Sequence, residues 1–459
     1  MSTSRNPRAW WASTSGQERS TFLGAAVILL TLAATSVFVW NSPNNPVRTA
    51  VGIVNDAGPT REDKLVEERN ALLSRVVALE NDLRSQDTEL DASKTELIAL
   101  QEQLWATEGE LDAVKASRSS AAPATPTKSK PVVAASGISA PARSKLVAPT
   151  SPYLGLYTEQ APFNFATYDA TAKKIGSDPN VVGYFGGWDE KFRVNAVENA
   201  WKRKKLPILT WEARPIAAAN DVVDEPDYTA AKILDGNFDA YLTQYAKDIV
   251  KTGLPMGIRL NHEMNGDWYP WAEGVNGNKG GDYVKVWRHV HDIFQREGAN
   301  SLIIWIWAPN IVNNLSSTQK TLEHTAALYP GDEYVDWVGL SGYLRPNYRA
   351  GNDFSFDYTF GPTLNQLRQI ADKPIFLAEI GASEIGGHKA TWITSLFEGL
   401  NKPENSDVIG FSWFSLAITS YVGGERATND WRVDSRADTL AAFKAGLNVP
   451  GSRFTLTAN

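Results

Sequence analysis

Two glutamates stand in sequence contexts that suit acid–base and nucleophilic chemistry. Glu263 follows the apolar run 256–260, and Glu379 ends the apolar run 375–379. Each run predicts a buried parallel strand, and in a (β/α)8 barrel the C-terminal ends of the strands carry the reacting groups. Two carboxylates that face each other across such a barrel mouth are the groups used in glycoside hydrolysis. We therefore take Glu263 and Glu379 as the candidate catalytic pair.

The strand periodicity predicts different environments for the two carboxyl groups. Side chains alternate along a strand, so Arg259 shares an inward face with Glu263. By the same rule, Leu377 shares an inward face with Glu379. A buried arginine beneath the pair would hold one carboxylate ionised, while the other would have a raised pKa and keep its proton. The alternative is that each glutamate only caps a strand end or pairs with an arginine.

The chain from Pro152 onward predicts an α/β fold of eight strand–helix units. The candidate strands are 154–157, 181–185, 207–210, 256–260, 302–307, 337–341, 375–379 and 409–414. Helices are predicted between them, for example at 238–251, 283–297, 362–371 and 390–400. Eight such units in about 300 residues favour a (β/α)8 TIM barrel over an open sheet. We place this domain at residues 151–459.

The N-terminal part of the chain predicts a membrane anchor. Residues 22–40 form an apolar stretch without a charged residue, long enough to cross a bilayer. Arginines at positions 5, 8 and 19 precede it, which predicts a cytoplasmic tail at 1–21 and an extracellular location for everything after the span. The prediction is a single-pass plasma-membrane protein with a signal-anchor helix. A cleaved signal peptide is the alternative.

Two further segments separate this anchor from the barrel. Leucines recur at heptad spacing through residues 60–117, with charged residues between them, which predicts a coiled coil and through it a homo-oligomer. A single charged helix that acts as a spacer is the alternative. Residues 118–150 are rich in Ser, Ala and Pro, which predicts a disordered linker.

Composition excludes several other classes of function. The net charge is −7 and the chain has no extended basic region, so nucleic acid is not an expected partner. The chain has no cysteine, and its five histidines show no metal-ligand spacing. Neither a metal nor another cofactor is therefore expected.

Two motifs resemble those of one enzyme family. Residues 262–271, His-Glu-Met-Asn-Gly-Asp-Trp-Tyr-Pro-Trp, resemble the acid/base motif of glycoside hydrolase family 26, and residues 374–382 resemble the nucleophile motif of its clan. The resemblance covers roughly residues 152–447. It implies a retaining endo-β-glycanase with Glu263 as general acid/base and Glu379 as nucleophile, about 5–5.5 Å apart. It also implies a polysaccharide substrate, with β-1,4-mannan as the family default and β-1,3-1,4-glucan as a close second.

The same resemblance implies roles for four further residues. His262 resembles a histidine that hydrogen-bonds near the scissile bond, and Trp268 an aromatic that packs at the cleavage subsite. Tyr343 resembles the tyrosine that donates to the nucleophile. Trp413 resembles the platform beneath the sugar ring, a role that suits an indole because sugar rings present apolar faces. The alternative for either tryptophan is packing in the core or at the rim.

One position departs from the mannanase pattern. Trp211 and Glu212 stand where mannanases of the family commonly have Trp-His, and we include both among the substrate-binding candidates. A carboxylate at this position could accept hydrogen bonds from adjacent sugar hydroxyls, as glucan-cleaving members suggest. Glu212 could equally pair with Arg214 or Arg259. The alternative for the whole chain is a tethered protein that binds or organises a polysaccharide without cutting it.

Overall fold

The computed structural model describes residues 137–454, except 220, 221, 347, 423, 424 and 451, together with residues 61, 64–72, 74, 75 and 78. The smaller group is helical and falls within the predicted coiled coil. The predicted membrane span at 22–40, the cytoplasmic tail, most of the predicted coil and the linker up to 136 lie outside the described residues. No helix among the residues described is both long and apolar enough to span a membrane. The anchor and the coiled coil stay predictions.

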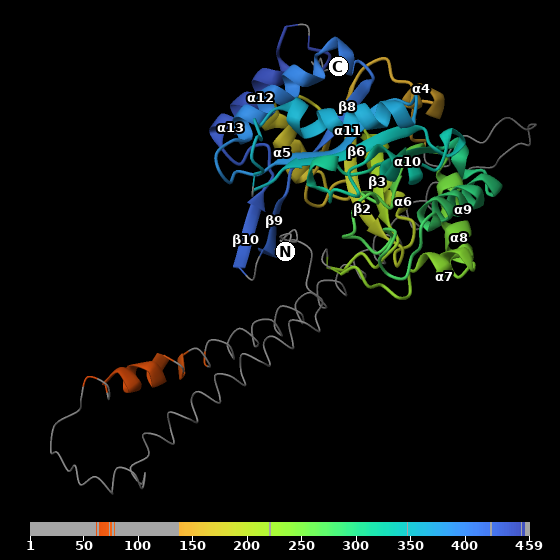
Figure 1. Cartoon of the computed structure of the whole chain (residues 1–459). Helices are drawn as coiled ribbons and strands as arrows, with labels where there is room; N and C mark the ends of the chain where they lie inside the picture. Colours follow the sequence, from red (N-terminus) through yellow and green to blue (C-terminus); the bar gives the residue numbers. More distant parts are fainter. Residues whose placement is uncertain are drawn as a thin grey trace, which may run out of the picture. The chain divides into compact units, whose positions relative to one another are not determined.

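Within the described residues, eight parallel strands close a barrel, and helices surround it (Figure 1). Strand β1 pairs with both β2 and β8, which closes the ring. The predicted (β/α)8 barrel is confirmed, and every predicted strand overlaps an observed one. The strands are β1 (Tyr153–Tyr157), β2 (Val181–Gly187), β3 (Leu206–Glu212), β4 (Met256–Leu260), β5 (Ile303–Trp307), β6 (Trp337–Leu344), β7 (Ile375–Ala382) and β8 (Val408–Phe414).

The helices pack their apolar faces against the outside of this barrel. They are α5 (Ala166–Ile175), α6 (Val194–Lys202), α7 (Ala230–Leu234), α8 (Asp239–Thr252), α9 (Asp282–Arg296), α10 (Leu322–Ala327), α11 (Phe356–Ile370), α12 (Lys389–Leu400) and α13 (Ala437–Leu447). Short 3-10 turns lie at η1 (Ala299–Ser301), η2 (Val312–Asn314), η3 (Asp332–Tyr334) and η4 (Pro403–Asn405).

One helix begins earlier than predicted. The prediction started it at Pro362, whereas α11 starts at Phe356, capped by Ser355, which accepts a hydrogen bond from the Tyr358 backbone N–H. Pro362 therefore lies inside the helix, where it cannot donate to the carbonyl four residues earlier. The Asn313 side chain donates to that carbonyl, Tyr358 O, at 2.5 Å. A side chain from another element thus compensates for the proline.

The end of the predicted linker is ordered and packs on the barrel. Helix α4 (Arg143–Val147) brings Arg143 to the Ile303 carbonyl and to Asp336, at 2.5 Å. Trp337 Nε1 donates to the Val147 carbonyl at 2.8 Å. These partners lie at the N-terminal ends of the strands, so α4 covers the pole opposite to the candidate mouth. The prediction of disorder is wrong for residues 137–150, because local composition did not reveal these long-range partners.

A further hairpin, which was not predicted, follows β8. Strands β9 (Ala417–Val422) and β10 (Glu425–Asp430) pair antiparallel and extend from the barrel (Figure 1). The chain returns from β10 to the barrel at Trp431, whose N–H donates to the Leu416 carbonyl at 2.9 Å.

Candidate active site

A bulge in β7 turns Glu379 toward the barrel interior. Three steps along β7, from Leu377 to Ile380, match two steps along β8, from Phe411 to Trp413. Leu377 pairs with Phe411, whose ring packs on Phe397 of α12, so Leu377 faces the helices. The extra residue reverses the alternation and brings Glu379 inward. The prediction that Leu377 shares the inward face is therefore wrong, although Glu379 does lie in the mouth.

Glu263 lies three residues beyond β4, in a turn with left-handed backbone. Asn261 and Glu263 have φ values of 43° and 57°. Neighbouring strands hold this turn, because the Glu263 N–H donates to the Ala308 carbonyl at 2.7 Å and Asn261 Oδ1 accepts from the Ala213 N–H at 2.9 Å. Such a backbone is unfavourable for non-glycine residues, and it is found where surrounding contacts enforce it at functional sites.

Arg259 connects the two carboxylates. It is fully buried, and its Nη1 lies 2.5 Å from Glu379 Oε2 while its Nη2 lies 3.9 Å from Glu263 Oε1. The Nη2 group also donates to Ser341 Oγ. The Tyr343 hydroxyl donates to the other oxygen of Glu379, Oε1. Both oxygens of Glu379 are thus held by donors, which fixes the orientation of the carboxylate.

The surroundings of Glu263 differ from the prediction. Trp268 Nε1 donates to Glu263 Oε2 at 2.9 Å, and His262 Nδ1 lies 3.7 Å from Oε1. Burial raises the pKa of Glu263, but the neighbouring His262 and Arg259 outweigh burial and lower that pKa below its ordinary value. The prediction was that the carboxyl group not paired with the buried arginine has a raised pKa. Arg259 pairs with Glu379, so this prediction applies to Glu263, and for Glu263 it is wrong. Sequence periodicity did not reveal that His262 faces this carboxylate.

Glu212 is a buried ion-pair residue. Its Oε2 lies 3.0 Å from Arg214 Nε and 2.9 Å from Arg214 Nη2, while its Oε1 lies 3.0 Å from His262 Nε2. Burial raises the pKa of Glu212, but His262 and Arg214 outweigh it, so the pKa is lowered. Side chains of the protein thus contact both carboxylate oxygens of Glu212, and its hydrogen bonds to sugar hydroxyls stay a prediction. Of the alternatives, the pairing with Arg214 is the one observed.

Two predicted sugar-binding tryptophans face away from the mouth. Trp211 is fully buried and stacks on Tyr245 of α8, with ring centroids 4.4 Å apart. Trp413 is also fully buried, packs against Trp392 of α12 and donates to the Trp431 carbonyl at 2.8 Å. Both lie between the barrel and its helices. Their predicted roles in substrate binding are wrong, because both side chains lie on the outward face of their strands, against the helices.

The inward aromatic residue at the end of β8 is Phe414. It pairs in register with Tyr157 of β1, and its half-buried ring lies 5.9 Å from Tyr343 and 6.3 Å from Phe185. The sequence analysis missed Phe414 and Phe185. A signal for Phe414 was present, since Gly410, Ser412 and Phe414 alternate with the large apolar residues of β8.

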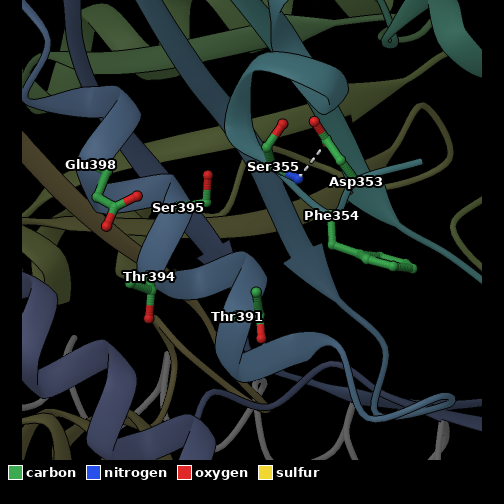
Figure 2. A pocket seen from close by; sticks show the side chains of 7 residues that line it. All are labelled: Asp353, Phe354, Ser355, Thr391, Thr394, Ser395 and Glu398. Carbon is green, nitrogen blue, oxygen red and sulfur yellow. Dashed lines mark hydrogen bonds between the residues drawn. The ribbon is translucent and has the colours of Figure 1, made fainter. Parts of the chain in front are cut away.

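An open cavity of about 450 Å³ lies outside this mouth, between the start of α11 and α12 (Figure 2). Two of its four hydroxyl groups hydrogen-bond the start of α11: Ser355 caps the helix, and Ser395 Oγ accepts from the Phe356 N–H at 3.0 Å. It includes neither Glu263 nor Glu379, so the candidate chemistry does not lie there. The lining residues are Asp353, Phe354, Ser355, Thr391, Thr394, Ser395 and Glu398.

Sequence comparison identifies the family of this barrel. Residues 176–394 match the family described as glycosyl hydrolase family 26, a range that contains both Glu263 and Glu379. The barrel is a member of family 26. The resemblance predicted from the two glutamate motifs is thereby confirmed.

Two known enzymes are similar to parts of the chain. Endoglucanase H of Acetivibrio thermocellus is 35% identical over 286 residues, which is 61% of this chain and 29% of that protein. Mannan endo-1,4-beta-mannosidase A and B of Caldalkalibacillus mannanilyticus is 30% identical over 142 residues, which is 30% of this chain and 24% of that protein. The chain thus spans less than a third of the length of either relative.

Solved structures agree on the fold of this family 26 barrel. The catalytic domain of the GH26 endo-beta-1,4-mannanase from Bacillus sp. JAMB-750 superposes with a TM-score of 0.50 at 18% identity, covering 66% of this chain and 87% of that one. At this identity the likeness shows the barrel fold alone.

Proposed function

We propose that this protein is an endo-β-glycanase that hydrolyses internal bonds of a β-linked glucan or mannan with retention of configuration. The observation that carries the proposal is the pair Glu263 and Glu379, both buried at the mouth of a family 26 barrel and both within reach of Arg259. Two carboxylates around one sugar-binding mouth suit the double displacement used by retaining glycosidases.

Hydrogen bonds and ion pairs orient each carboxyl group for its proposed role. Glu379 would attack the anomeric carbon and form a glycosyl ester, and Arg259 and Tyr343 hold its oxygens for that attack. Glu263 would protonate the departing glycosidic oxygen and then, as a base, activate the water that hydrolyses the ester. The Trp268 indole N–H would keep the Glu263 carboxyl group oriented between these two steps.

The aromatic lining of the mouth would provide the sugar contacts. Phe414 and Phe185 present half-buried rings beside the catalytic pair, and a pyranose ring can stack its apolar face on such a ring. Similarity to Endoglucanase H, at 35% identity over 286 residues, exceeds similarity to the mannan endo-1,4-beta-mannosidase of Bacillus subtilis, at 23% over 252 residues, and favours a glucan. The ion pairs of Glu212 with Arg214 and His262 add no preference between glucan and mannan.

We extend the proposal to the location of the enzyme. The apolar stretch 22–40 would anchor it in the plasma membrane as a single-pass protein with the barrel outside, and residues 60–117 would form an oligomeric coiled coil. Membrane fractionation and protease accessibility of the barrel in intact cells would test the topology, and a barrel protected from protease would contradict it.

Hydrolysis of defined polymers tests the central proposal. The full chain and its Glu379→Ala variant would be incubated with mannan, glucomannan, β-1,3-1,4-glucan and β-1,3-xylan, and new reducing ends would be counted. We expect oligosaccharides from a glucan or a mannan with the wild type and none with the variant. If neither the wild type nor the variant released reducing ends, but the protein still bound one of the polymers, the result would instead favour a tethered binding protein.

A further inference from the structure

Four buried residues form a continuous charged chain that ends at the proposed acid/base. Arg214 contacts Glu212 Oε2 at 2.9 Å, Glu212 Oε1 contacts His262 Nε2 at 3.0 Å, and His262 Nδ1 faces Glu263 Oε1 at 3.7 Å. The members of this chain are exposed by 7% at most. Water therefore has little access to the contacts, and each charge acts strongly on its neighbour.

The chemistry of Glu212 determines which nitrogen of His262 carries a proton. An ionised carboxylate can only accept hydrogen bonds, and Arg214 favours the ionised form of Glu212. His262 must therefore hold a proton on Nε2 in this contact. That arrangement directs Nδ1 at Glu263, and Nδ1 has no hydrogen-bond partner among the described residues. The ring is also held in place by Tyr269 and Trp271, at centroid distances of 4.8 and 5.7 Å.

We propose that Glu212 is a positioning residue, which orients His262 toward Glu263 and thereby controls when Glu263 holds its catalytic proton. This inference rests on the proposed function, because it assigns a regulator to the acid/base of that reaction. A protonated His262 beside Glu263 favours the carboxylate form, and a neutral His262 would favour the acid. Glu212 stabilises the protonated imidazole, so it would restrict the acid form of Glu263 to lower pH.

Other charged and titratable groups surround His262 and Glu263, and they come from several strands and loops. Arg259 also favours the ionised form of Glu263, but it is bound to Glu379 at 2.5 Å and stays charged at every pH of interest. His262 is then the neighbour of Glu263 whose charge can change near neutral pH. Burial and Arg259 lower the pKa of His262, but Glu212 and Glu263 outweigh them and raise it. The remaining groups are Glu379 on β7, Tyr343 on β6, Arg345 after β6, and Arg214 and Tyr269 in the loops after β3 and β4.

The Glu212→Gln variant of the full chain tests the proposal. The neutral amide would no longer stabilise the imidazolium, so the pKa of His262 should fall and that of Glu263 should rise, each by about one to three units. Nuclear magnetic resonance would follow the imidazole nitrogens of labelled histidine and the carboxyl carbons of labelled glutamate. Unchanged titrations of His262 and Glu263 in the variant would overturn the proposal.

Kinetics adds a readout that a purely structural role would not move. With a susceptible polymer, the alkaline limb of kcat/KM should shift to higher pH in Glu212→Gln, following Glu263. With a dinitrophenyl glycoside, whose leaving group needs no proton, kcat/KM should show no such shift. Asp336→Asn, which removes an ion pair with Arg143 at the opposite pole, serves as the matched control and should leave the limb unmoved. The proposal would also be overturned if Glu212→Gln lowered kcat/KM equally on both substrates and left the alkaline limb of the pH profile in place.

The test remains decisive if the variant does not fold or if the wild type hydrolyses none of the polymers. In the wild-type chain alone, the neutral ring of His262 should carry its proton on Nε2, and the imidazolium form should persist above pH 6.5, the ordinary pKa of histidine. A proton on Nδ1 alone, or a pKa below that value, would refute the proposed link. Absence of hydrolysis with the expected titrations would reject the proposed function and leave the Glu212–His262 coupling intact.

Discussion

Trp413 and Phe414 are neighbours in sequence but should respond to substitution in opposite ways. Trp413 is fully buried between β8 and the helices, and its indole N–H donates to the Trp431 carbonyl. Trp413→Ala would leave a cavity and an unpaired buried carbonyl, which together cost about 3–5 kcal/mol of the free energy of unfolding. At roughly 2–4 °C per kcal/mol for a domain of this size, Tm should fall by about 10 °C.

Phe414→Ala should instead weaken substrate binding. A sugar ring that covers one face of Phe414 would remove on the order of 80 Å² of apolar surface from water, which contributes about 2 kcal/mol. Loss of that contact should raise KM by about 30-fold. Because the Phe414 ring is only half-buried, the accompanying fall in Tm should be smaller than for Trp413→Ala.

The assay combines thermal unfolding with Michaelis kinetics on the polymer that the wild type cleaves. Each variant serves as the control of the other, since both remove one large aromatic side chain from the same strand. If Trp413→Ala kept the wild-type Tm but lost substrate affinity while Phe414→Ala bound normally, the inward and outward assignment of β8 would be refuted.

The structure supports two further predictions. Tyr343→Phe removes the hydroxyl that donates to Glu379, a charge-assisted hydrogen bond of about 1.5–3 kcal/mol, so kcat should fall by about 10- to 150-fold with Tm nearly unchanged; an unchanged kcat would show that Glu379 is oriented without it. A fragment of residues 151–459 lacks α4, the Arg143 ion pair and the acceptor for Trp337 Nε1, so its Tm should lie roughly 5–15 °C below that of a 137–459 fragment. Equal Tm values in calorimetry would contradict the docking of α4.

The barrel could be predicted because its strands are short apolar runs at regular intervals, and burial of parallel strands on both faces demands such runs. Element boundaries were less predictable. The start of α11 depends on the Asn313 side chain, which compensates for Pro362 from a different element. The docking of α4 depends on Asp336, almost 200 residues away in the chain. Neither contact leaves a pattern in the local sequence.

Within the site, residue types could be predicted better than their partners. The motifs located Glu263, Glu379 and His262, the family resemblance pointed to Tyr343, and all four lie together in the mouth. The partner of Glu212 could not be chosen from the sequence, since Arg214 and Arg259 were equally plausible. Which arginine is near depends on the turn after β3, where the chain places Arg214 beside Glu212. The direction in which Trp211 and Trp413 point could not be predicted from the sequence, because both faces of a barrel strand are apolar.

The β7 bulge explains why a prediction built on strict alternation still identified the nucleophile candidate. Phe376 faces the barrel interior, where its ring lies 5.5 Å from that of Trp337. Strict alternation from Phe376 would direct Glu379 outward, into an apolar helix layer that offers no cation. A buried unpaired carboxylate there would cost several kcal/mol, whereas the extra residue between Phe376 and Glu379 brings the carboxylate to Arg259 and the Tyr343 hydroxyl. The irregular register is therefore what places this charge in the mouth, and regular strand geometry alone would have placed it among the helices.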